Sequence, residues 1–246
     1  MIKSNSWQLF QSFLVFLQKL LIAAHWRALL LLLIGVYLPL QGFGALAEEV
    51  WENEGGFSWD VPTLLAIHLT ASPQLDVFAV TLTKFGVYWG VFPVASVMVL
   101  VFLIRQRWQS LTYLLTTLLG SIIINRSVKI LLHRVRPHLW VSPTPELDFG
   151  FPSGHAMSSM TLVAALVILT WGSYWCWMVL IFGGLFVLAV GWTRLYLGVH
   201  YPSDILAGWM ASIAWAVGVS LLIRPHLTKP NAVSEVEPSV EPSTEP

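Results

Sequence analysis

The stretch HAMSSMTLVAALVILTWG, residues 155–172, decides the fold class because it contains no Lys, Arg, Asp or Glu. About 20 apolar residues in a helix are enough to cross a lipid bilayer. Five other long apolar runs bring the predicted spans to six, at 28–47, 87–104, 110–131, 155–172, 174–195 and 205–223. The sequence therefore predicts an all-α polytopic membrane protein with a six-helix transmembrane bundle.

The composition excludes several classes of protein. Of the 246 residues, 56% are hydrophobic and 11% are charged, whereas a soluble domain has about 25% charged residues. Thirteen basic residues balance thirteen acidic ones, so the chain lacks the basic excess of a nucleic-acid-binding protein. The single Cys176 excludes an internal disulfide and a cysteine-based metal site.

The segments around the predicted spans have different characters. Residues 1–27 carry apolar side chains at helical spacing with a polar opposite face, which predicts a cytoplasmic interfacial amphipathic helix. The following leucine run and Ala45-Leu46-Ala47 also resemble a signal peptide, but the run is long enough to span, so we expect a retained helix. The acidic, proline-containing segment 48–86 predicts one or two short helices that form an outer cap, and residues 224–246 predict a disordered cytoplasmic tail.

Basic residues beside the spans set the predicted orientation. Seven of the thirteen lie in the N-terminal segment, the turn after the second span and the C-terminus. Five of the other six lie in segments that we assign to chemistry. We therefore expect a cell-membrane protein with both termini in the cytoplasm and segments 48–86, 132–154 and 196–204 outside.

The third span ends in KILLHRVRP, residues 129–137. Lys129 and Arg136 are seven residues apart, so they share a face if the helix continues as far as Pro137. A simpler interpretation is that both side chains reach for lipid headgroups. FPSGH, residues 151–155, opens the fourth span, and Ser153 and Gly154 at a helix start offer free N–H groups to an anion, although Ser153 also suits a simple helix cap.

The fifth and sixth spans are joined by TRLYLGVHYPSD, residues 193–204. Asp204 follows His200 by four residues and can reach back to one imidazole nitrogen, which fixes the tautomer and frees the other nitrogen as a nucleophile. The alternative is a surface His-Asp pair without a role. On the loop between the first two motifs, Glu146 and Asp148 could shape the choice of substrate, but we expect them to be solvated.

Together these segments point to a phosphate site. Lys129, Arg136 and Arg194 repel one another unless an anion lies among them, and a phosphate matches their charge and donors. One of the two histidines, His155 or His200, can attack phosphorus while the other protonates the leaving oxygen.

The three motifs resemble the signature of the type 2 phosphatidic acid phosphatase (PAP2) family, the membrane relatives of vanadium-dependent haloperoxidases. That signature reads Lys-x6-Arg-Pro, Pro-Ser-Gly-His and Ser-Arg-x5-His-x3-Asp, and this chain departs from it only at Thr193, which keeps the hydroxyl. The resemblance implies a PAP2/haloperoxidase-like core within residues 28–223.

The resemblance also implies the role of each residue. His200 would form a phosphohistidine, Asp204 would orient it, and His155 would protonate the leaving alkoxide and then activate water. The residues implied to cradle the phosphate are Lys129, Arg136, Ser153, Gly154 and Arg194. The family needs no metal or other cofactor.

The leading hypothesis is thus a metal-independent phosphatase that acts at the outer face on a phospholipid or isoprenoid lipid phosphate. Phosphatidic acid, phosphatidylglycerol phosphate and undecaprenyl pyrophosphate are the substrate classes that the family implies. A lipid phosphotransferase using the same residues is one alternative, and a non-enzymatic transporter of anionic lipid is another. We expect no nucleic-acid partner and no obligate protein partner.

Overall fold

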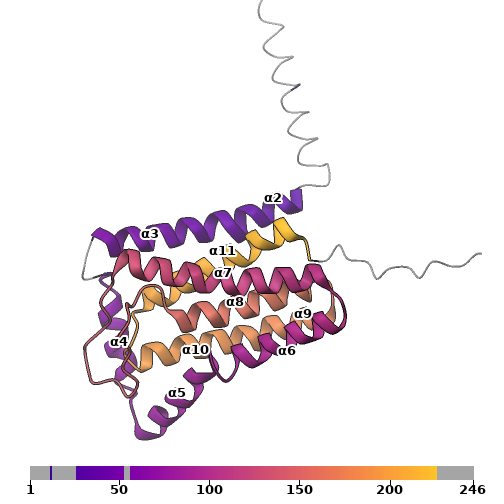
Figure 1. Ribbon diagram of the computed structural model, residues 1–246. Coiled ribbons are helices and arrows are strands. Elements are labelled where there is room, and N and C mark those ends of the chain that lie inside the picture. Colours follow the sequence, from indigo (N-terminus) through magenta and orange to yellow (C-terminus); the bar gives the residue numbers. More distant parts are fainter. Residues whose placement is uncertain (1–11, 13–25, 53–55, 226–246) are drawn as a thin grey trace, which may run out of the picture.

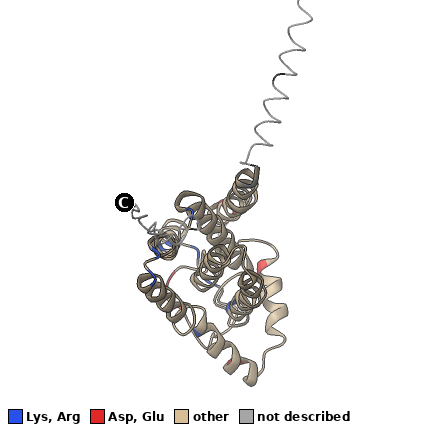
Figure 2. Cartoon of the chain, turned by 90° about the vertical axis from the view of Figure 1, so that its right-hand side faces the viewer, with Lys and Arg blue, Asp and Glu red and all other residues tan. Residues whose placement is uncertain are grey.

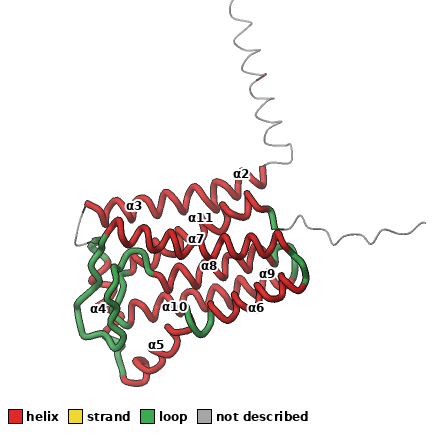
Figure 3. The backbone as a smooth tube through the Cα atoms, viewed as in Figure 1, coloured by secondary structure: helices red, strands yellow, loops and turns green. Residues whose placement is uncertain are grey.

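A computed structural model describes residues 12, 26–52 and 56–225 of the chain. Within these residues every regular element is a helix (Figure 3). The α-helices are α2 (Trp26–Leu32), α3 (Leu38–Glu52), α4 (Asp60–His68), α5 (Pro73–Phe85), α6 (Val91–Ile104), α7 (Trp108–Leu132), α8 (Gly154–Leu169), α9 (Tyr174–Met178), α10 (Gly184–Tyr196) and α11 (Pro202–Ile223). Two π-helical turns, Leu33–Tyr37 and Val179–Gly183, join α2 to α3 and α9 to α10.

The long helices run side by side, with α11 packed against α8, α3 and α7 (Figure 1). Viewed along the bundle, most of the ribbon is tan because few residues are charged (Figure 2). The closest packing is between α8 and α11, where a Cβ at Gly208 would lie 3.1 Å from the carbonyl oxygen of Ser153. Small residues allow membrane helices to approach in this way, and here they bring together the helix ends that carry the predicted motifs.

A chain of buried hydroxyl groups links three helices below these ends. Ser121 of α7 lies 2.8 Å from the Oγ1 of Thr161 on α8, and Thr161 donates to the Oγ of Ser212 on α11 at 3.0 Å. Each hydroxyl finds its partner only when the helices hold one register, so the chain fixes the heights of α7, α8 and α11 relative to one another.

The prediction of an all-helical membrane fold is confirmed, whereas the count of six spans is not. By length and composition, four segments of the described chain can cross a membrane: Ala28–Glu52, Trp108–Leu132, Tyr174–Tyr196 and Pro202–Ile223. The other two predicted spans correspond to α6 and α8, which are apolar but have only 14 and 16 residues. α8 stops before the predicted end because Gly172 turns the chain with a φ of 79°.

The two ends of the bundle differ. α4, α5 and the long loop 133–153 gather at one end, and the described chain ends, Trp26 and Pro225, lie at the other (Figures 1 and 3). The first predicted span, 28–47, is longer in the structure because α3 continues to Glu52. The acidic residues after position 47 therefore do not end the helix. The amphipathic helix predicted for residues 1–27 and the tail predicted for residues 224–246 lie almost wholly outside the described residues.

Candidate active site

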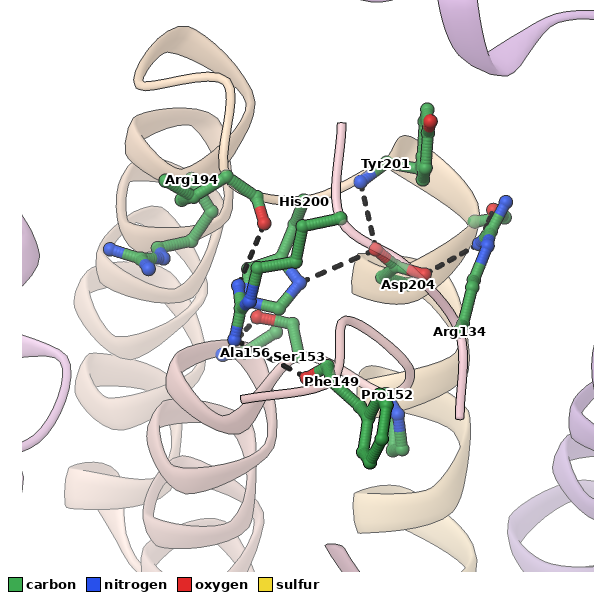
Figure 4. A network of polar contacts seen from close by, with 12 residues as sticks. Arg134, Phe149, Pro152, Ser153, Ala156, Arg194, His200, Tyr201 and Asp204 are labelled. Atoms are coloured by element: carbon green, nitrogen blue, oxygen red, sulfur yellow. Dashed lines mark hydrogen bonds and ion pairs between the residues drawn. The ribbon is translucent and has the colours of Figure 1, made fainter. Parts of the chain in front are cut away.

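The structure brings the predicted site residues together at the end of the bundle that carries α4 and α5. They come from five places: the last turn of α7 (Lys129), the loop after α7 (Arg136), the start of α8 (Ser153, Gly154, His155), the last turn of α10 (Arg194), and the turn into α11 (His200, Asp204). Figure 4 shows the centre of this arrangement, with His200 between Arg194 and Asp204. The three motifs therefore form one cluster.

His200 is fully buried, and both of its ring nitrogens have partners. Its Nδ1 lies 3.3 Å from the Oδ2 of Asp204, as the four-residue spacing predicted. Its Nε2 lies 2.8 Å from the Nη1 of Arg136. A guanidinium only donates hydrogen bonds, so Nε2 accepts and the proton is assigned to Nδ1, where it is donated to the carboxylate. Burial, followed by the charges of Arg136 and Arg194, lowers the pKa of His200 well below its usual range, which keeps this imidazole neutral.

The expectation that Lys129 and Arg136 share one helical face is wrong. α7 ends at Leu132, and His133 adopts a left-handed conformation with a φ of 49°, so Arg136 lies on an irregular segment. The two cations nevertheless meet at one group, because the carboxylate of Asp148 accepts from the Nζ of Lys129 at 2.7 Å and from the Nη2 of Arg136 at 2.5 Å. Tertiary folding, and not helical periodicity, pairs them.

The expectation that Glu146 is solvated is also wrong. One of its carboxylate oxygens forms an ion pair with the Nη2 of Arg194, and the other lies 2.6 Å from the Nη2 of Arg136. The same two oxygens lie 3.9 Å from the Nδ1 of His155 and 3.8 Å from the Nε2 of His200. The carboxylate of Glu146 thus lies between both imidazoles and among the cations, in the place that the sequence assigned to a phosphate.

The charges around Glu146 and Asp148 keep both carboxylates ionised. Burial opposes ionisation of Glu146, but the guanidinium charges of Arg194 and Arg136 outweigh it, and its pKa is lowered. Burial likewise opposes ionisation of Asp148, yet Lys129 and then Arg136 lower its pKa to about 2. Two ionised carboxylates of the loop 133–153 therefore offset two of the three positive charges of Lys129, Arg136 and Arg194 in this structure.

Two further residues, neither of them in the three motifs, hold the site in shape. Thr83, at the end of α5, accepts from the Nη1 of Arg194 at 2.7 Å. Asn125 donates to the carbonyl oxygen of Pro152 at 3.0 Å and so ties the start of α8 to α7. Neither residue stands in a chemical motif, so only the structure identifies them.

The start of α8 has the geometry of an anion site. The Oγ of Ser153 lies 3.5 Å from the amide nitrogen of Ala156, so the hydroxyl caps the helix. α8 begins at Gly154, so its first N–H groups have no acceptor within the helix. A Cβ at Gly154 would meet only the Oδ1 of Asn125, at 3.5 Å, so the glycine is not required by crowding.

The described residues contain no group of three or more His, Cys, Asp or Glu side chains arranged to hold a metal ion. The cluster combines guanidinium and ammonium groups with two imidazoles, and such donors suit an oxyanion. Fold and site together define a helical membrane protein with a buried cluster of cations and two histidines at one end of the bundle.

Comparison with known proteins identifies the class more closely. Residues 109–227 match the model of the PAP2 superfamily. The chain is 29% identical over 206 residues to an undecaprenyl-diphosphatase of Sulfolobus acidocaldarius, covering 81% of this chain and 91% of that protein. It is 31% identical over 167 residues to a lipid A 4'-phosphatase of Bacteroides thetaiotaomicron, covering 61% of this chain and 70% of the relative.

A solved structure agrees with these similarities. The crystal structure of a transmembrane PAP2 type phosphatidylglycerolphosphate phosphatase from Bacillus subtilis superposes with a TM-score of 0.67 and 27% identity, covering 77% of this chain and 97% of that one. This chain therefore belongs to the PAP2 superfamily of membrane lipid phosphatases. The prediction of family and enzyme class made from the three motifs is confirmed.

Proposed function

We propose that this protein hydrolyses a phosphate monoester or pyrophosphate of a membrane lipid through a phosphohistidine on His200. The observation that carries the proposal is the position of one carboxylate, that of Glu146, whose two oxygens lie 3.8 and 3.9 Å from the imidazoles of His200 and His155. A small anion in that position faces a nucleophile on one side and a proton donor on the other. The relatives are named as phosphatases of lipids, and this supports the same chemistry.

In the first step, the phosphate replaces the carboxylate of Glu146 and takes up the donors of Arg136 and Arg194. This releases the lone pair on the Nε2 of His200, which attacks phosphorus and forms a P–N bond while the P–O bond to the lipid breaks. His155 takes up a proton when the anionic substrate binds and, as an imidazolium, gives that proton to the leaving oxygen. The Nδ1 proton of His200 stays on its hydrogen bond to Asp204, whose charge stabilises the cationic phosphohistidine.

In the second step, a water molecule gives a proton to His155 as its oxygen attacks phosphorus. The P–N bond breaks, inorganic phosphate leaves and His200 returns to its neutral form. Lys129, Arg136, Arg194 and the N–H groups at the start of α8 stabilise the charge on the equatorial oxygens in both steps. Every step uses protein groups and water, so we expect turnover to survive a chelator.

The substrate and the membrane arrangement belong to the same proposal. Phosphatidic acid, phosphatidylglycerol phosphate and undecaprenyl pyrophosphate are the candidate classes. We propose that α6 and α8 cross the membrane together with the four longer segments, which gives a six-span domain over residues 28–223 with residues 48–86 as an outer cap. The site then lies on the extracytoplasmic face and both chain ends lie in the cytoplasm.

The test is release of inorganic phosphate from these three lipids in detergent, with EDTA present and without any acceptor lipid. We expect wild-type protein to release phosphate and His200→Ala to lose at least about 1000-fold in kcat, because the nucleophile is removed. An unchanged elution volume in size-exclusion chromatography shows that the variant is folded. Undiminished turnover by His200→Ala contradicts the proposal, and turnover only with an added lipid hydroxyl indicates a phosphotransferase instead.

A further inference from the structure

Arg134 and Asp60 form an ion pair that is buried beside the site and absent from its three motifs. The Nη2 of Arg134 donates to the Oδ2 of Asp60 at 2.7 Å, and the two side chains are only 3% and 0% exposed. Asp60 is the first residue of α4, whereas Arg134 lies just beyond the end of α7. The pair therefore connects the segment outside the bundle to the loop that carries Arg136.

Asp60 also holds the first turn of α11. Its Oδ1 accepts from the backbone N–H of Ser203 at 3.0 Å, and its Oδ2 accepts from the Ser203 hydroxyl at 2.6 Å. The Ser203 N–H belongs to the first turn of the helix and has no acceptor within it. A carboxylate at this position caps α11 and fixes the residue that precedes Asp204.

Arg134 holds Asp204 directly. Its Nη1 donates to the Oδ1 of Asp204 at 2.5 Å and to the Oγ of Ser203 at 2.7 Å. The other carboxylate oxygen of Asp204 accepts from the backbone N–H of Tyr201 at 2.8 Å and lies 3.3 Å from the Nδ1 of His200. Figure 4 shows Asp204 between Arg134 and His200. With partners on both oxygens, the carboxylate cannot rotate, and its plane sets the direction of the imidazole.

We propose that Asp60 and Arg134 are positioning residues for phosphoryl transfer, acting through Asp204 on His200. This inference rests on the proposed function, because it assumes that His200 is the nucleophile. The contacts of Arg134 are with Asp60, Ser203 and Asp204, and its guanidinium lies over the ring of Tyr201 at 4.5 Å. Loss of the pair should therefore slow the chemical step and leave phosphate binding by the cradle nearly unchanged.

The test measures kcat and KM of Asp60→Asn with phosphatidic acid in detergent. The variant keeps the shape of the side chain and removes the charge that holds Arg134. We expect kcat to fall by about 10- to 100-fold, the usual cost of losing a partner that orients a catalytic group, while KM stays within about twofold. Ser203→Ala removes the hydroxyl that bridges Arg134 and Asp60 but leaves both charges in place, and we expect a smaller loss of kcat, about 3- to 10-fold.

Asp76→Asn is the matched control. Asp76 of α5 accepts from the hydroxyl of Tyr196 on α10 at 2.8 Å, so this variant also removes a carboxylate contact between the outer segment and the bundle. It has no link to Asp204, and we expect its kcat to stay within about twofold of the wild-type value. If Asp60 had a purely structural role, Asp60→Asn would have a lower thermal midpoint, but the kcat of its folded protein would be unaltered.

The outcomes separate this inference from the proposed function. If His200→Ala is inactive while Asp60→Asn and Ser203→Ala turn over at the wild-type rate, the positioning role is refuted and the phosphohistidine mechanism stands. If His200→Ala keeps full activity, the mechanism itself fails. Should Asp60→Asn not fold, Ser203→Ala decides: a fall in kcat at constant KM supports the inference, and a wild-type kcat overturns it.

Discussion

Glu146 places its two carboxylate oxygens among Arg136, Arg194, His155 and His200, although it stands on a loop and in no motif. An ion pair with two cations neutralises a cluster that would otherwise hold several like charges close together. A substrate phosphate has to take these same donors. Under the proposed function, Glu146 competes with the substrate for the cradle, and its charge sets how tightly an anion binds there.

Glu146→Gln is expected to strengthen inhibition by inorganic phosphate or vanadate by about 5- to 20-fold, because it raises the fraction of protein whose cradle is open to an anion. The lowered pKa of Glu146 means that the carboxylate stays ionised below its usual value of about 4.3. Competition therefore persists over the neutral and mildly acidic range, and the ratio of the two inhibition constants should stay constant between about pH 5.5 and pH 8.

The measurement is the inhibition constant for vanadate with phosphatidic acid as substrate. Glu48→Gln removes the same charge from an exposed position on α3 and should leave the constant unchanged. Equal inhibition of wild type and Glu146→Gln would show that the carboxylate does not compete for the cradle.

At the scale of elements, the site depends on the crossing of α8 and α11. Ser153 donates its backbone N–H to the carbonyl oxygen of Asp204 at 3.1 Å, so the starts of the two helices are joined directly. Just below, Gly208 of α11 leaves room for the backbone and for Ala156, whose Cβ would lie 3.3 Å from an added Cβ. The distance between His155 and His200 follows from this close approach.

Gly208→Leu is expected to push α8 and α11 apart, to cost about 1–3 kcal/mol in stability through overpacking and to lower kcat by more than about tenfold. Gly218→Leu is the matched control on the same helix, since an added Cβ there meets nothing within 4 Å. A helical leucine is itself favoured over glycine, so only packing explains a loss. Thermal midpoint and turnover of the two purified variants check the prediction, and equal behaviour would count against it.

At the scale of the whole molecule, the charged site and the described chain ends occupy opposite ends of the bundle (Figure 1). Val141 in the loop 133–153 is 96% exposed, and Gln109 near the start of α7 is exposed at the other end. The proposed orientation puts Val141 outside the cell and Gln109 in the cytoplasm.

Single-cysteine variants test that orientation in intact cells. In a Cys176→Ser background, Val141→Cys is expected to react with a membrane-impermeant maleimide, and Gln109→Cys should react only after the membrane is permeabilised. Retained phosphatase activity of each variant is the control for folding. The reverse labelling pattern would place the site in the cytoplasm and overturn the proposed topology.

The sequence alone determined the class of the molecule and most of the site. Long uncharged runs have no other low-energy environment than a bilayer, so they predict membrane helices directly. Three motifs with fixed internal spacing pointed to Lys129, His155, Arg194 and Asp204. The four-residue spacing also predicted the contact between His200 and Asp204. The sequence predicted six apolar segments, but it did not predict the lengths of the helices in them. The ends of α6 and α8 depend on local turns.

Tertiary structure alone decided which charges meet. Arg136 leaves the helix that periodicity predicted for it, yet it joins Lys129 on Asp148, because the loop 133–153 folds back over the site. Glu146 reaches the cradle and Asp60 reaches Arg134 across a separation of 74 residues. No pattern along the chain encodes such contacts, since the pairing of buried charges is fixed by how helices pack and not by local spacing.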